Sequence, residues 1–186
     1  VTVGYEFDQT SGEWGSATFI QGFDISGAAP RPFSYAELSG APLNQYSVDL
    51  YKNHLRVVTT ESQWWPERKT LNKLWVLKLP ERGPLIAASN PKMELTGETG
   101  HLGKPNEEVF AVRFMRDKAY IVTFEQTDPF YVLNVTDPTN PIVIGELQIP
   151  GFSSYLHPIK IDGVDMMIGV GRHVDPASGR NDGAKI

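Results

Sequence analysis

Short runs of apolar residues, separated by turn residues, are the dominant pattern along this chain. The clearest series lies between Glu108 and Pro158, where four runs rich in β-branched and aromatic residues follow one another. These runs cover residues 110–115, 119–124, 130–135 and 142–148. Pro, Asn and Asp residues in the links between them favour turns. Because consecutive strands this close in sequence must pair antiparallel, the pattern predicts a four-stranded meander.

The same pattern recurs on both sides of this meander. A second complete unit is predicted over residues 46–90, with strands at 47–51, 55–60, 74–79 and 85–89. Two half units are predicted at the ends of the chain, over about residues 16–39 (strands 17–25 and 33–38) and 155–171 (strands 155–161 and 164–170). Asp162-Gly163 in the last half unit is a strong hairpin signal. The remaining segments are predicted as a loop insertion at 91–108 and a polar loop at 172–183.

A repeated four-stranded meander is typical of a β-propeller, in which such blades surround a central channel. The predicted fold class is therefore all-β, a single β-propeller segment of two full blades and two half blades. Propellers typically have four to eight blades, so we expect the segment to be part of a larger propeller. The alternative is self-association, in which the exposed edges of the half blades pair between molecules.

Composition narrows the classes of function. The chain has 22 acidic and 17 basic residues, for a formal net charge of -5, and no cluster of Lys and Arg. This excludes the phosphate-neutralising surface that nucleic-acid binding needs. The absence of cysteine excludes disulfides, thiolate metal sites and thiol nucleophiles. No apolar run approaches the roughly 20 residues of a membrane span. Stability must therefore come from apolar packing.

Three stretches carry a resemblance to known proteins. They are residues 113–158, the segment YSVDLYKNHLRVVTT at 46–60, and NKLWVLKL at 72–79. Together they resemble bacterial and archaeal secreted proteins with a C-terminal β-propeller domain that is distantly related to WD40 repeats. The resemblance covers most of the chain from Tyr46 onward. It implies an exported protein, secreted or at the cell envelope, whose biochemical role is uncharacterised, and it carries over no catalytic residue.

The links between strands predict where a ligand would bind. In a meander, the links between strands two and three and the links between blades lie at the same end of the sheets. The long, chemically rich links all fall in this set, so we predict one loop-rich face with binding residues Trp64, Trp65, His101 and Asp128. Adjacent indoles such as Trp64 and Trp65 offer a flat platform to a sugar, a peptide or an arginine. The alternative is that these rings cap the blade core.

The polar loop near the end of the sequence is a candidate calcium site. Asp175, Ser178, Asn181 and Asp182 supply oxygen donors, and Ca²⁺ takes six to eight oxygen ligands from flexible loops. The spacing departs from the EF-hand pattern, and the alternative interpretation is a polar hairpin loop with Asx turns. Calcium is the one cofactor to which the sequence points. The four histidines match no zinc-site spacing and are interpreted as independent structural or surface residues.

Two functions are consistent with these features. The sequence favours a binding or scaffolding module that binds a protein or a glycan through its loop-rich face, since no nucleophile motif or catalytic constellation is found. The alternative is a hydrolase whose site lies at the channel mouth and is completed by other blades, which rests on analogy between propeller folds alone.

Overall fold

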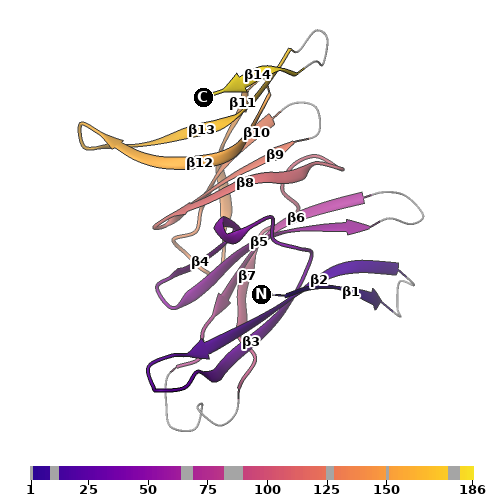
Figure 1. The fold of residues 1–186 in the computed structure, drawn as a ribbon, viewed down its shortest axis with the longest axis vertical. Helices are drawn as coiled ribbons and strands as arrows, with labels where there is room; N and C mark the ends of the chain where they lie inside the picture. The colour runs from indigo at the N-terminus through magenta and orange to yellow at the C-terminus, as the bar shows by residue number, and fades with distance from the viewer. Residues whose placement is uncertain are drawn as a thin grey trace.

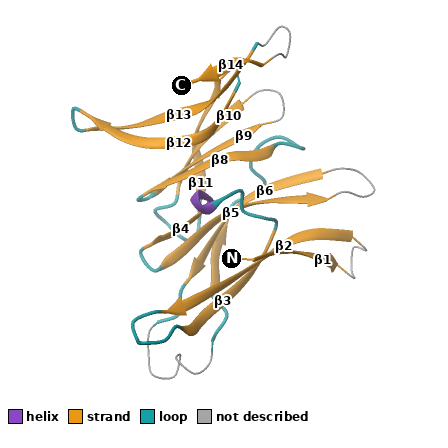
Figure 2. Cartoon of the chain, viewed as in Figure 1, coloured by secondary structure: helices purple, strands orange, loops and turns teal. Residues whose placement is uncertain are grey.

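The structure is a computed structural model that describes most of the chain. The described residues are 2–8, 13–63, 69–81, 90–124, 128–149, 151–175 and 181–186. Within them the side chains of residues 5–8, 13–14, 63, 128, 149 and 181–182 are not described. Most of these residues lie in β-strands, and one short 3-10 helix lies among them (Figures 1 and 2).

The elements follow one another in this order: β1 (Thr2–Asp8), β2 (Glu13–Asp24), β3 (Arg31–Ser39), η1 (Gln45–Ser47), β4 (Val48–Tyr51), β5 (His54–Gln63), β6 (Lys69–Lys78), β7 (Glu94–Glu98), β8 (Glu108–Met115), β9 (Lys118–Phe124), β10 (Asp128–Asn134), β11 (Ile142–Ile149), β12 (Phe152–Ile161), β13 (Val164–Val174) and β14 (Asn181–Lys185).

The strands form four separate antiparallel sheets, each made of consecutive strands. We name them sheet A (β1-β2-β3), sheet B (β4-β5-β6-β7), sheet C (β8-β9-β10-β11) and sheet D (β12-β13-β14). Figure 1 shows the sheets succeeding one another along the long axis, from sheet A at the bottom to sheet D at the top. Sheets B and C are the four-stranded meanders expected of propeller blades. The predicted fold class, an all-β propeller segment, is therefore confirmed.

Tight two-residue turns fix the register of the first hairpin in sheets B and D. Asp162 and Gly163 join β12 to β13 with φ of 49° and 82°, and Lys52 and Asn53 join β4 to β5 with φ of 47° and 62°. Positive φ at both central residues matches the right-handed twist of the flanking strands. The hairpin predicted at Asp162-Gly163 is confirmed, and Asn53 takes the left-handed conformation that Asn tolerates well.

Sheets A and D each hold one strand more than the half blades predicted from the sequence. The additional strands are β1, which pairs along β2, and β14, which pairs along the end of β13. The predicted polar loop at 172–183 is correspondingly too long, because β13 continues to Val174 and β14 begins at Asn181. The β14 sequence NDGAK has low intrinsic β-propensity. Its conformation is therefore set by the open edge of β13.

The fourth strand of sheet B also differs from the prediction. It is β7, inside the segment predicted as a loop insertion, whereas the predicted strand at 85–89 lies outside the described residues. Gly97 explains why β7 lies there: a Cβ atom on it would be 2.4 Å from the carbonyl oxygen of Pro138, so its backbone packs directly on sheet C. The long link at residues 79–93 therefore lies at the hairpin end of the sheets. The prediction that all long links lie at the opposite end is wrong.

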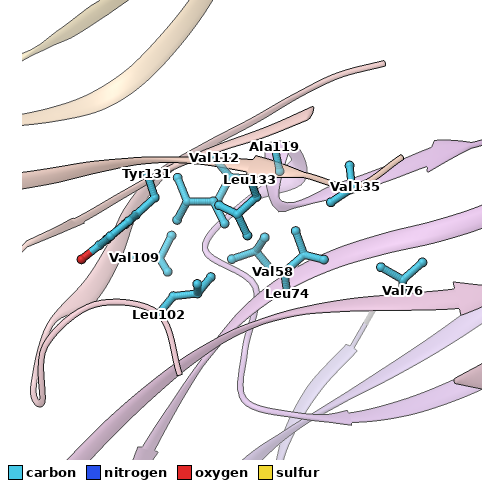
Figure 3. Packing of buried hydrophobic residues seen from close by; sticks show 11 residues of the cluster. Val58, Leu74, Val76, Leu102, Val109, Val112, Ala119, Tyr131, Leu133 and Val135 are labelled. Atoms are coloured by element: carbon cyan, nitrogen blue, oxygen red, sulfur yellow. The ribbon is translucent and has the colours of Figure 1, made fainter. Parts of the chain in front are cut away.

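Each pair of neighbouring sheets encloses a hydrophobic cluster. The cluster between sheets B and C includes Val58, Leu74, Val112, Ile121 and Leu133 (Figure 3). The cluster between sheets A and B includes the neighbouring residue Val57, because successive side chains of a strand point to opposite faces. A third cluster, built on Ala111, Val122 and Leu156, joins sheets C and D. The central sheets are thus buried on both faces, which explains their nearly continuous apolar strands.

Sheet D exposes apolar side chains at the far end of this stack. Ile161, Val164, Met166 and Val170 are all exposed, and cross-strand pairing places Ile161 beside Val164. The side chains on the other face of β12 and β13, including those of Leu156 and Met167, pack on sheet C. The outer face of sheet D thus resembles the buried faces of sheets B and C, as expected for a sheet at the end of an unclosed series.

The buried phenol of Tyr131 makes stability sensitive to alkaline pH. Burial raises the pKa of Tyr131 to about 12, and the negative charges of Glu146 and Glu107 act in the same direction. In an unfolded chain a tyrosine titrates near pH 10. The contribution of Tyr131 to stability is therefore complete below pH 10 and lost as the pH rises to 12. In urea unfolding across this range, we expect Tyr131→Phe to lose less stability than the wild type; equal losses would contradict this assignment.

Candidate functional site

The residues predicted to bind a ligand on the loop-rich face are only partly described. Trp64 and Trp65 lie outside the described residues. Asp128 begins β10, and its side chain is not described. His101 lies in the described link between β7 and β8. The aromatic platform therefore stays a prediction.

His101 is part of the packing of this link onto sheet B. Its Nδ1 atom accepts a hydrogen bond from the backbone N–H of Asn72 at 3.1 Å, and its Nε2 atom lies 3.2 Å from the carbonyl oxygen of Lys104. A neutral imidazole with its proton on Nε2 satisfies both contacts. Both ring nitrogens thus have backbone partners, and His101 positions the link between sheets B and C.

The predicted calcium ligands do not all lie in one loop, because two of them are the first residues of strand β14. Asn181 and Asp182 begin this strand, Asp175 directly follows β13, and Ser178 lies outside the described residues. The calcium site stays a prediction. In the described part of the chain, no group of three or more His, Asp or Glu side chains is arranged to hold a metal ion.

A cluster that the sequence analysis did not single out lies where sheets B, C and D converge. We call the edge formed by η1 and the first strands β4, β8 and β12 the inner edge, since β8 contacts both η1 and β12 there. The inner-edge cluster consists of Tyr46 on η1, Arg113 on β8, and Tyr155 and His157 on β12. Sheets C and D, together with the turn η1 that leads directly into sheet B, therefore contribute to one group of side chains.

Arg113 is the centre of this cluster. Its guanidinium carbon lies 4.1 Å from the ring centre of Tyr46 and 5.3 Å from that of Tyr155, within the range of cation–π attraction. The two tyrosine rings are 5.7 Å apart in an edge-to-face arrangement. The Nε atom of Arg113 donates a hydrogen bond of 2.8 Å to the carbonyl oxygen of Leu156. Arg113 thus links sheet C to sheet D and packs against a ring from sheet B.

Local interactions hold the aromatic members in place. Asn44 caps η1, because its Oδ1 atom accepts a hydrogen bond of 2.9 Å from the backbone N–H of Tyr46. The hydroxyl of Tyr155 lies 3.1 Å from Nδ1 of His157. Tyr46, Arg113 and Tyr155 are half-buried, whereas His157 is exposed. The cluster is therefore both fixed by the sheets and accessible to a ligand.

Comparison with known proteins agrees with this architecture. A family model described as a β-propeller domain matches residues 1–186. The chain belongs to the β-propeller domain family. In propellers the blades surround a central channel, and in this chain the first strands β8 and β12 contact each other at the inner edge.

Two archaeal proteins of uncharacterised function are similar to this propeller segment. One, from Methanocaldococcus jannaschii, is 40% identical over 139 residues, which cover 75% of this chain and 20% of that protein. The other, from Archaeoglobus fulgidus, is 44% identical over 133 residues, covering 72% of this chain and 18% of that protein. The chain thus spans about a fifth of the length of these relatives. No solved structure matches it.

These matches confirm the propeller part of the resemblance seen in the sequence and its archaeal members. The secreted, C-terminal setting stays a prediction. In the described residues, no helix is long and apolar enough to cross a membrane.

Proposed function

We propose that this propeller segment is a binding module, and that a protein partner inserts a peptide segment at the inner-edge cluster. The observation that carries the proposal is the convergence of Tyr46, Arg113 and Tyr155 from three successive sheets. The site differs from the loop-rich face favoured by the sequence. It lies on regular strands and one capped turn.

The chemistry of the cluster supports binding of a protein. Tyrosine and arginine are enriched among the residues that dominate binding energy at protein interfaces. A tyrosine ring offers a large contact area at a small cost in conformational entropy, and its hydroxyl can form hydrogen bonds. An arginine fixed against two contacting rings presents its remaining N–H groups in a defined plane. This combination suits a ligand with both apolar and polar groups.

The support beneath the cluster favours tight binding. A hydrogen bond within the protein already holds the side chain of Arg113, so less of its side-chain freedom is lost when a ligand binds, and the Asn44 cap fixes the backbone of Tyr46. A cluster on the edges of three packed sheets also keeps its geometry better than one on a loop. The inner edge is therefore preorganised for an extended segment that contacts sheets B, C and D together.

Peptide binding tests this proposal. The purified chain is probed with an array of random-sequence peptides, and the affinities of the bound peptides are measured by fluorescence polarisation for the wild type and for Tyr46→Ala. We expect Tyr46→Ala to weaken binding by a factor of ten or more, because truncation of a central aromatic contact typically costs at least about 1.4 kcal/mol, which is tenfold.

A change at an exposed position far from the cluster provides the control. Leu95→Ala alters an exposed side chain on the outer strand β7 of sheet B, and we expect its peptide affinity to equal that of the wild type. Peptides that bind equally well to Tyr46→Ala would show that the inner-edge cluster is not the binding site. Such a result would instead favour binding at the predicted residues Trp64 and Trp65.

The location of the module is part of the same proposal. We propose that the protein acts at the cell envelope or outside the cell, supported by the resemblance of residues 113–158 to secreted propeller proteins. Immunodetection in fractionated cells of the source organism tests it, and recovery in the cytosolic fraction alone would contradict it.

A further inference from the structure

A second arginine, Arg56, makes contacts that can be compared with those of Arg113. Arg56 on β5 is 3% exposed and lies between the rings of Tyr51, at 4.9 Å, and Phe114, at 4.8 Å. Its Nη1 atom donates a hydrogen bond to the carbonyl oxygen of Arg116 in the neighbouring sheet. Its Nε and Nη2 atoms both bond the Oδ2 atom of Asp49. Arg56 is thus an inter-sheet arginine whose charge is neutralised by a carboxylate.

Arg113 has similar neighbours but is less buried, and it lacks that carboxylate. It too lies against two aromatic rings, Tyr46 and Tyr155, and it too bonds a backbone carbonyl of the next sheet, that of Leu156. Within the described ranges, no Asp or Glu forms an ion pair with Arg113, and its Nη1 and Nη2 atoms have no hydrogen-bond partner. The two arginines therefore differ in two respects: Arg56 is buried and paired with Asp49, whereas Arg113 is half-buried and has no carboxylate partner among the described residues.

We propose that Arg113 binds a carboxylate of the ligand, in the role that Asp49 has beside Arg56. The proposal rests on the proposed function, since it concerns the same cluster, and it adds the chemical class of the group recognised there. The occupant is the side chain of an Asp or Glu in the bound peptide segment. Its two oxygens pair with the free Nη1–H and Nη2–H groups of Arg113.

The geometry and charge of the cluster favour this ligand. The guanidinium is planar and matches the two oxygens of a carboxylate, which gives a shorter and stronger pair than neutral hydrogen bonds do. The contacting rings of Tyr46 and Tyr155 partly exclude water from Arg113, so an opposite charge is attracted more strongly than on an open surface. The aromatic rings also provide contact for the methylene groups of a Glu side chain. Together these features select a carboxylate over an uncharged amide.

The test uses peptides from the array whose binding depends on Tyr46. Each is synthesised with its acidic residues intact and with each Glu or Asp replaced by Gln or Asn. Each is also made with a free and with an amidated C-terminus, which separates a side-chain carboxylate from a chain-terminal one. We expect one acid-to-amide change to weaken binding of the wild-type chain at least tenfold, whereas amidation of the terminus leaves it unchanged.

Variants of Arg113 test whether this loss of peptide affinity depends on the guanidinium group. Arg113→Lys keeps the positive charge but loses the paired donors, and we expect it to bind the acidic peptide at least tenfold more weakly than the wild type does. With the matched amide peptide, Arg113→Lys and the wild type should bind with equal affinity. Thermal unfolding of the variant, compared with the wild type, checks that sheets C and D remain packed.

The outcomes separate this inference from the proposed function. Peptides that depend on Tyr46 but bind equally well as acid and amide would overturn the carboxylate and leave the binding module intact. A dependence on the free C-terminus instead of a side chain would also overturn the assignment. Binding that depends on neither Tyr46 nor Arg113 would overturn both proposals.

Discussion

Replacing Ile121 with alanine is expected to lower the free energy of unfolding by about 3 to 4 kcal/mol. Ile121 lies on β9 in the middle of sheet C and is 0% exposed. It belongs to the cluster between sheets B and C, where Val58 and Leu74 pack from the opposite sheet (Figure 3). Because both sheets are fixed by their own hydrogen bonds, they cannot move together to fill the space. The cavity therefore adds to the lost transfer free energy.

A second isoleucine of sheet C provides a matched control for this prediction. Ile144 on β11 is 51% exposed, and Ile144→Ala is expected to change stability by about 0.5 kcal/mol or less. Urea unfolding followed by tryptophan fluorescence measures both variants under the same conditions. If the two variants lost similar stability, the packing of sheet B on sheet C would not be the source of the stability of the fold.

Replacing Asn72 with alanine is expected to cost about 3 kcal/mol, because it leaves buried polar groups without partners. Asn72 on β6 is 0% exposed. Its Nδ2 atom donates hydrogen bonds to the carbonyl oxygens of Leu102, at 3.0 Å, and Glu107, at 2.9 Å. Its Oδ1 atom accepts one of 2.7 Å from Thr60. This single side chain thus fixes the link between sheets B and C to the strands of sheet B.

The loss of stability in Asn72→Ala should be accompanied by a local change in amide hydrogen exchange. Residues 99–107 are expected to exchange their amide hydrogens faster in the variant, because this link loses two of its anchors. The exposed Asn140 serves as control, and Asn140→Ala should leave both stability and exchange unchanged. A loss below about 1 kcal/mol on replacing Asn72 would mean that the network around Glu107 rearranges to satisfy its members.

Local sequence was sufficient to predict sheet C and the first three strands of sheet B because these strands are apolar and bounded by strong turn residues. Asp162-Gly163 adopts the positive φ angles that its hairpin requires. The elements that were not predicted depend on distant contacts. Strand β7 is set by the close approach of Gly97 to Pro138, and β14 by the open edge of β13. Neither contact leaves a periodic pattern in the segment that it orders.

The inner-edge cluster was not predicted for a related reason. Tyr46, Arg113 and Tyr155 are separated from one another by more than forty positions along the chain, and they lie in three different elements. One signal was present: Tyr46 and Tyr155 both stand at the start of a first-strand pattern in the repeat. Arg113 carries no such signal, because its role arises from the packing of β8 between η1 and β12. Only the packing of β8 against η1 and β12 brings Arg113 against both rings.

Arg113 on the inner edge is proposed to be a binding group, whereas Arg56 is structural. Nuclear magnetic resonance of the chain labelled at arginine nitrogens observes both side chains in one sample during titration with glutarate, a small dicarboxylate. We predict that the Nε–H signal of Arg113, assigned with Arg113→Lys, shifts and saturates. The signal of Arg56, already paired with Asp49, should not move. Equal movement of both signals, or none at Arg113, would contradict the account.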